Sequence, residues 1–171
     1  MPYLRKATDA PFGFIPADGD KARVTQYEHA TTDPGVFAGD ALKLTSAGQV
    51  TSITAATDII VGVAAETLVT ASGTAFINVY DDPDQRFLVQ EDSVGTALSQ
   101  TLVGNLFDIN GFLPTTTAQV TRGRSIMQLD TSTGLTAPTT GKGQLKLIGQ
   151  SGLESSTYPT ASGNPRKVIV T

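Results

Sequence analysis

Residues 75–90 read AFINVYDDPDQRFLVQ, in which apolar and polar residues alternate on either side of an acidic segment that contains proline. A period of two places Ile77 and Val79 on one face of a first strand, and Phe87 and Val89 on one face of a second. The DDPDQ between them has the composition of a turn. This stretch therefore predicts two strands joined by a turn.

Short strands separated by turn residues are expected along the rest of the chain as well. Residues 41–45 and 49–53 flank Ser46-Ala47-Gly48, whose glycine suits a three-residue hairpin loop. Residues 59–65 form an uninterrupted apolar run, which predicts a central strand covered on both faces. Helical spacing competes at residues 94–106, where we expect a short helical turn. Further strands are expected at residues 106–109, 125–129, 144–148 and 167–170.

The composition favours strands and turns. Charged residues make up 16% of the 171 residues, against about 25% in an average globular protein, and exposed helices normally carry many charges. The length fits one ordinary domain. We therefore predict an all-β fold, a compact antiparallel β-barrel or sandwich with an extended N-terminal arm and little helix.

The arm is assigned to residues 1–35, ahead of a single β domain at residues 36–171, because prolines and glycines interrupt every periodic pattern in the first segment. Its large apolar side chains should dock on a surface rather than lie in water. They are Tyr3, Leu4, Phe12, Phe14 and Ile15. That surface is either the protein's own core or a neighbouring molecule, and the sequence favours neither.

Net charge and residue content narrow the classes of partner. The formal net charge is −4, which argues against nucleic acid because phosphate binding depends on Lys and Arg. No apolar run approaches the roughly 18 residues of a membrane span. Cysteine is absent, so thiolate metal sites and disulfides are excluded. We expect neither a nucleic-acid nor a membrane partner, and no cofactor.

The residues required for catalysis are sparse. His29 is the single histidine, and no Gly-x-Ser-x-Gly motif provides a nucleophile. A lone histidine is more often a packing or surface residue than a general base. We therefore expect the protein not to be an enzyme.

The strongest charge feature is an acidic cluster, and its first three members form what we call the acidic turn. The cluster consists of Asp81, Asp82, Asp84, Glu91 and Asp92. An EF-hand is excluded because the sixth position counted from Asp82 is Phe87 rather than glycine. An irregular cation site would be the functional interpretation of these carboxylates, but a solvated turn between two strands is favoured. We expect no metal site.

Two basic features are candidates for interfaces. Arg122 and Arg124 precede a predicted strand and could pair with a partner's carboxylate. Residues 141–171 carry four basic residues and one acidic residue, a net charge of +3, opposite in sign to the acidic turn. Such asymmetry could steer contacts between identical copies, although two unrelated solvated surfaces would give the same pattern.

Several phrases, read in order, resemble the head decoration, or capsid cement, proteins of tailed phages. The phrases are DAPFGFIP at 9–16, VFAGDALKL at 36–44, IVGV at 60–63, YDDPDQRFLVQ at 80–90, and GRS at 123–125 with LD at 129–130. Their order, and their coverage of nearly the whole chain, matter more than any single phrase. The most specific is DDPDQ-x-F-x-V-Q.

The resemblance implies a protein without catalysis on the outer surface of the virion capsid, assembled in the host cytoplasm. Such proteins bridge neighbouring subunits of the major capsid protein as homo-oligomers, with a trimer favoured over a dimer. The arm could add a strand to a capsid subunit or fill a groove on it. The alternative is a receptor- or glycan-binding fibre or spike module, against which the 6% aromatic content without Trp counts.

Overall fold

The computed structural model describes residues 11–17, 22–30, 35–69, 74–92, 98–111, 123–132, 144–150 and 167–171. In these ranges the chain is almost entirely β, which confirms the predicted fold class. No helix in them is long and apolar enough to cross a membrane. Of the residues singled out above, Tyr3, Leu4 and Arg122 lie outside the described residues.

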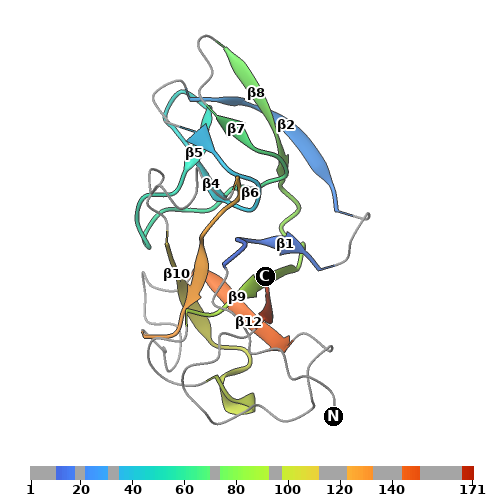
Figure 1. The fold of residues 1–171 in the computed structure, drawn as a ribbon, viewed down its shortest axis with the longest axis vertical. Helices are drawn as coiled ribbons and strands as arrows, with labels where there is room; N and C mark the ends of the chain where they lie inside the picture. Colours follow the sequence, from blue (N-terminus) through green and yellow to red (C-terminus); the bar gives the residue numbers. More distant parts are fainter. Residues whose placement is uncertain are drawn as a thin grey trace.

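Five strands close a barrel in the order β2-β5-β4-β6-β8, in the upper half of Figure 1. They are β2 (Val24–His29), β4 (Ala41–Leu44), β5 (Val50–Ser52), β6 (Gly62–Ala64) and β8 (Ala75–Tyr80). β2 and β8 pair antiparallel from Val24–Tyr80 to His29–Ala75. A parallel contact between His29 and Val50 closes the ring, so the barrel presents no free strand edge.

Six strands form a second sheet in the order β1-β9-β13-β12-β10-β11, in the lower half of Figure 1. They are β1 (Ile15–Pro16), β9 (Phe87–Gln90), β10 (Leu106–Asn110), β11 (Gln128–Asp130), β12 (Leu145–Gln150) and β13 (Lys167–Val170). A parallel bridge between Glu91 and Leu129 brings β11 back to the end of β9. The sheet therefore curls towards closure. A separate pair joins β3 (Gly35–Val36) to β7 (Leu68–Val69).

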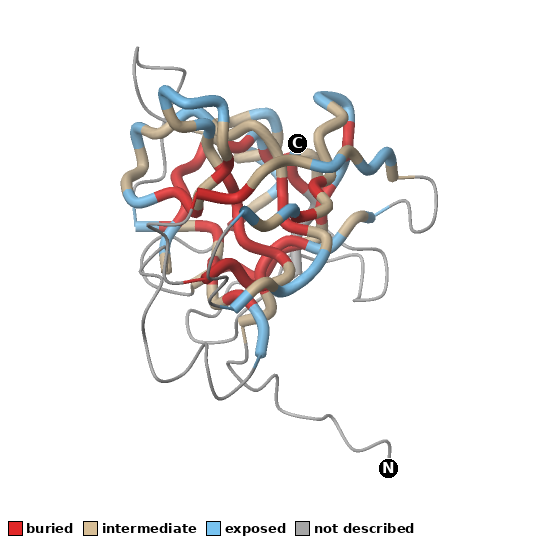
Figure 2. The backbone as a smooth tube through the Cα atoms, turned by 90° about the horizontal axis from the view of Figure 1, so that it is seen from above, coloured by how far each residue is buried: buried red, intermediate tan, exposed pale blue. Residues whose placement is uncertain are grey.

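Two apolar clusters fill the molecule, and the buried backbone lies at its centre in Figure 2. One cluster lies inside the barrel, around Leu42 and Ile77. The larger cluster lies under the second sheet, around Phe107 and Leu147, and it also contains Val63 from barrel strand β6. The barrel and the sheet therefore pack on each other through shared apolar contacts.

The expected β4–β5 hairpin is confirmed, with Leu44 opposite Val50 and Gly48 at φ 80° in its loop. The strands expected near residues 75–80 and 86–90 are also present, as β8 and β9. They do not form a hairpin with each other, because β8 belongs to the barrel and β9 to the second sheet. The acidic turn is therefore the crossover between the two sheets.

The arm assignment needs correction for the described residues before position 35. Residues 24–29 form β2, a full member of the barrel, and residues 15–16 form β1 on the second sheet. The prolines and glycines separate these strands rather than prevent them. Phe14 is 2% exposed and packs edge-on against the Phe87 ring, with 6.2 Å between centroids. Its docking surface is the protein's own core.

Two other expectations differ from the structure. The apolar run at 59–65 is not a doubly covered strand, because only Gly62–Ala64 is a strand and Ile59 is 87% exposed. The carboxylate of Asp58 instead holds a loop that leads into β6. In residues 94–106 the described helical structure is a 3-10 turn at Gln100–Leu102, and residues 93–97 lie outside the described residues.

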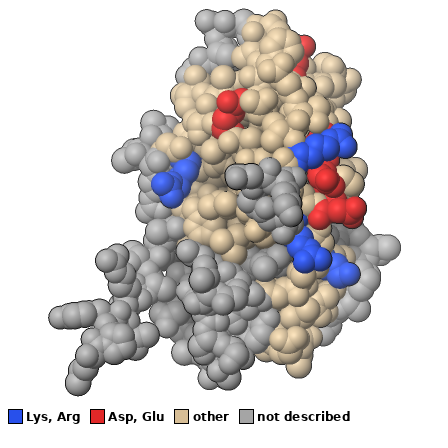
Figure 3. All heavy atoms as spheres, turned by 90° about the vertical axis from the view of Figure 1, so that its right-hand side faces the viewer, with Lys and Arg blue, Asp and Glu red and all other residues tan. Residues whose placement is uncertain are grey.

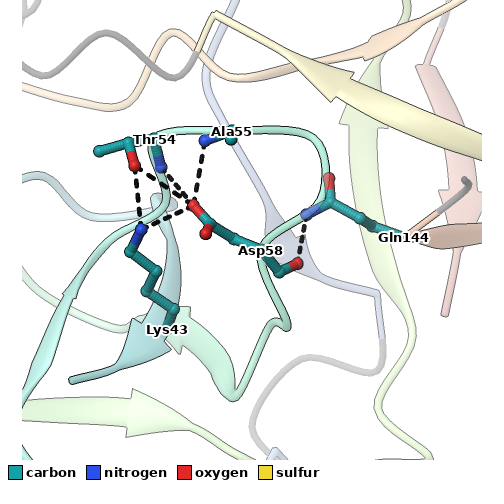
Figure 4. Close-up of polar contacts among 5 residues, drawn as sticks. All are labelled: Lys43, Thr54, Ala55, Asp58 and Gln144. Atoms are coloured by element: carbon teal, nitrogen blue, oxygen red, sulfur yellow. Dashed lines mark hydrogen bonds and ion pairs between the residues drawn. The ribbon is translucent and has the colours of Figure 1, made fainter. Parts of the chain in front are cut away.

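Asp58 ties the loop at residues 54–58 to its surroundings (Figure 4). Its Oδ2 accepts hydrogen bonds from the Thr54 and Ala55 N–H groups, at 2.8 and 3.0 Å, and pairs with Lys43 Nζ at 2.8 Å. The Gln144 side chain donates to the Asp58 carbonyl at 2.7 Å. This network joins the barrel to β12 of the second sheet. Burial acts against the charged carboxylate, but the Lys43 and backbone hydrogen bonds outweigh it and lower the pKa of Asp58.

Asp58→Asn is expected to reduce stability by about 1–2 kcal/mol at neutral pH, because charge-assisted hydrogen bonds are lost. The lowered folded pKa means that the stabilisation is complete above the unfolded value of about 3.9 and is lost as the pH falls through the folded value. The difference in the free energy of unfolding between the variant and the wild type should therefore become smaller below about pH 4. Urea unfolding across this range measures it. The exposed Asp84→Asn is the control, and a gap that does not change with pH would contradict the assignment.

Candidate interface groove

Three segments that are distant in sequence meet beside β1. The Phe14 N–H donates to the Gly39 carbonyl at 2.9 Å, and the Ser125 N–H donates to the Ala38 carbonyl at 3.2 Å. Gly13 has φ 71°, and a Cβ at this position would lie 2.3 Å from Ser125 Cβ. Glycine is therefore required for the segments to approach so closely.

A groove of about 370 Å³ lies over this junction. Phe12, Ile15 and Pro16 contribute apolar surface from the N-terminal segment, and Ala65 contributes from the barrel. Arg124 also lines it. We call this the Arg124 groove. Ile15 is 46% exposed, and Arg124 is exposed and forms no hydrogen bond or ion pair with any other described residue. A mostly apolar groove with one exposed guanidinium can recognise an apolar segment that carries a carboxylate.

Three of the four residues at positions 14–17, in and around β1, have no N–H group available to another strand. The Phe14 N–H is already used by Gly39, and Pro16 has none. The Ala17 N–H donates inward, to the Arg86 carbonyl at 2.8 Å. A proline on a short edge strand is a common protection against further pairing. We therefore expect a partner at the Arg124 groove to bind through side chains rather than by strand addition.

Among the interface residues expected from the sequence, Phe12, Ile15 and Arg124 come together around the groove. Phe14 also lines it, but its burial makes it a core residue rather than a free anchor. Reasoning from the sequence missed Tyr80 and the Ala38-Gly39 backbone, which complete the lining. Since these residues are supplied by separate segments, no local pattern could have identified them.

The acidic turn is only partly solvated, which corrects the expected solvated turn. The Asp81 side chain is 6% exposed, and it lies 3.3 Å from Arg23 Nε. It also accepts hydrogen bonds from Thr25 Oγ1 and the Tyr27 hydroxyl, both at 3.0 Å. Burial, together with the hydrogen bond to Asp81, raises the pKa of Tyr27. Asp81 therefore has a structural role, linking the turn to β2.

The tip of the acidic turn, in contrast, faces solvent. Pro83 and Asp84 are exposed, and the turn is held by hydrogen bonds from the Gln85 and Asp84 N–H groups to the Asp82 carbonyl and side chain, both at 3.0 Å. In Figure 3, basic and acidic side chains gather along one margin of the face that is shown, and most of the rest of its coloured surface is uncharged. The turn presents a fixed proline next to a free carboxylate.

The described residues contain no group of three or more His, Asp or Glu side chains placed to hold a metal ion. His29 lies in the barrel wall on β2 and is 2% exposed. A second pocket, of about 290 Å³, lies where the barrel meets the second sheet and is lined by apolar residues such as Ile60 and Leu145. Phe14 and Tyr80 line both this pocket and the Arg124 groove, so the two hollows are neighbours.

No family model, curated protein or solved structure matches this chain.

Proposed function

We propose that this chain is a capsid decoration protein that binds the outer surface of a phage head and stabilises it by bridging major capsid subunits. The ordered resemblance of the sequence phrases suggests this class. The structural observation that supports a role in assembly is the Arg124 groove, because a mostly apolar lining with one exposed guanidinium fits a protein interface. A ligand that binds only the assembled shell stabilises it by mass action.

The protein would act as a homo-oligomer, because several modest contacts to one shell gain from multivalency. We assign the Arg124 groove to the contact between copies and the acidic turn of a neighbour as its occupant. Pro83 offers an apolar tip to the apolar walls, and Asp84 offers a carboxylate to the exposed Arg124. Charge complementarity of this kind sets both the orientation and the rate of association.

Cryo-electron microscopy of the native particle tests the proposal directly. We expect density for this chain on the outside of the head, over the junctions between major capsid subunits. Density confined to the tail would instead support the alternative, a receptor- or glycan-binding fibre or spike module. Co-sedimentation of the purified chain with heads that lack it would provide a second measurement.

The N-terminal anchors offer a more specific prediction. We expect the double variant Tyr3→Ser/Leu4→Ser to lose binding to heads while its thermal midpoint stays that of the wild type. This follows if the two side chains dock on a capsid subunit, where their apolar area is removed from water. Head co-sedimentation and thermal unfolding check the two parts. A lowered midpoint with head binding retained would show that the segment docks on its own domain.

A further inference from the structure

Asn110 and Gly111 form the single asparagine–glycine pair of the sequence, since Asn78, Asn105 and Asn164 precede valine, leucine and proline. Asn110 is exposed at the end of β10. The Gly111 N–H donates to Asn110 Oδ1, with 2.7 Å between nitrogen and oxygen. The side-chain amide of Asn110 is thus folded back onto the peptide nitrogen that follows it.

We propose that Asn110 is a site of spontaneous deamidation in the folded protein, independent of the function proposed above. Hydroxide removes the Gly111 amide proton, and the nitrogen attacks Asn110 Cγ to form an N–Cγ bond. The Cγ–Nδ2 bond breaks, and the leaving nitrogen takes a proton from water and departs as ammonia. A five-membered succinimide remains. One water then opens the ring at either carbonyl carbon, which leaves aspartate or isoaspartate at position 110.

The fold requires glycine at position 111, and this glycine is also what makes Asn110 reactive. A glycine leaves its own nitrogen unshielded, because it has no side chain. Gly111 has φ 78°, and a Cβ here would lie 2.5 Å from the Ile126 carbonyl oxygen. Any larger residue would therefore be strained and would collide with backbone. The close approach of Gly111 to residue 126 thus keeps a reactive pair at the end of β10.

The other described asparagines are less favourable sites. Asn78 lies within β8, and the residue that follows it, Val79, is β-branched and completely buried. Asn105 precedes Leu106, the first residue of β10. In both cases a bulky side chain shields the nitrogen that would have to attack. These two positions are internal controls that experience the same solvent and the same incubation as Asn110.

Deamidation would act on a contact that holds three strands together. Asn110 Nδ2 donates to Asp92 Oδ2 at 3.2 Å, and Asp92 Oδ1 accepts from the Thr131 N–H and hydroxyl at 3.1 and 2.7 Å. We call Asp92, Asn110 and Thr131 the Asp92 clasp. It lies beside the Glu91–Leu129 bridge through which the second sheet approaches closure. The reaction replaces the donor with a carboxylate, so that two like charges face each other.

The test is incubation of the native full chain in mildly alkaline buffer, below its melting midpoint, followed by proteolysis and mass spectrometry. We expect loss of the amide at Asn110, in both the aspartate and isoaspartate forms, while Asn78 and Asn105 keep theirs. Asn110→Gln should retain its side-chain amide under the same conditions, because the corresponding ring has six members and closes more slowly. An Asn110 amide that survives as long as those of Asn78 and Asn105 would overturn the proposal.

The structural consequence is tested with Asn110→Asp, compared with Asn105→Asp as a matched change of charge. We expect the variant at position 110 to show the larger fall in melting midpoint and faster amide hydrogen exchange at residues 128–130. Incubated wild-type protein should shift in the same direction as its amide is lost. Equal midpoints for the two variants would overturn the proposed loosening of the Asp92 clasp.

Discussion

Gly13→Ala is expected to lower the free energy of unfolding by about 3 kcal/mol. Roughly 1 kcal/mol comes from placing a side chain in the left-handed region, since Gly13 has φ 71°. About 2 kcal/mol more comes from overpacking, because the added Cβ would lie 2.6 Å from the Gly39 carbonyl oxygen as well as against Ser125. Ser125 is fully buried and cannot easily move aside.

Gly48→Ala is the matched control for this experiment. Gly48 has φ 80°, and no heavy atom lies within 4 Å of a Cβ built there. We therefore expect Gly48→Ala to lower the free energy of unfolding only by the backbone-conformation contribution, about 1 kcal/mol. Denaturant unfolding of both variants gives the comparison. Equal losses would show that the contact between residue 13 and Ser125 is not tight, and the Arg124 groove would then lack its rigid base.

Arg124→Glu is expected to abolish self-association at the concentrations where the wild-type chain self-associates. Placing a carboxylate opposite the neighbour's Asp84 replaces attraction with repulsion, and charge changes at desolvated pairs cost about 3 kcal/mol, roughly a hundred-fold in Kd. Sedimentation velocity of the isolated chain measures the loss. The variant should keep the wild-type melting midpoint, because Arg124 pairs with no other described residue.

Three further variants make this result specific. Lys146→Glu makes the same change of charge at an exposed position on β12 and should leave self-association unchanged. Asp84→Arg alone should also disrupt it, and the double variant Arg124→Glu/Asp84→Arg should restore it. A wild-type chain that stays monomeric, or a double variant that is not restored, would refute the contact between copies. Oligomers that ignore phage heads would instead refute the capsid function and leave the contact standing.

The parts of the fold that could be predicted are those encoded by local alternation. β8 and β9 follow from residues 75–90 because one face of each strand is apolar, and the β4–β5 hairpin follows from its loop glycine. β2 was missed because VTQYEH is mainly polar. It becomes a strand by pairing with β8, which lies some fifty positions further along the chain. Pairing over such a distance leaves no periodic signal in the segment itself.

Three of the residues that line the Arg124 groove were selected from the sequence, but their meeting at one place was not predicted. Phe12, Ile15 and Arg124 are unusual as large apolar or cationic residues in turn-rich segments, and that was enough to select them. Their neighbourhood depends on Gly13 and Gly39, whose missing side chains allow the backbones to touch. Asp81 was selected as part of an exposed acidic turn, but it has a structural role. Its three partners lie on or next to β2, a strand that was not predicted.

β13, the last strand along the chain, lies between β9 and β12 in the interior of the second sheet (Figure 1). While the chain emerges from a ribosome, β9 and β12 are present before the strand that joins them. The barrel can form earlier, since all of its strands precede residue 81. The second sheet would thus remain open until residues 167–170 have been synthesised. A chain that lacks residues 167–170 would leave β9 and β12 without the strand that pairs with both, and unpaired strand edges of this kind can pair with other chains.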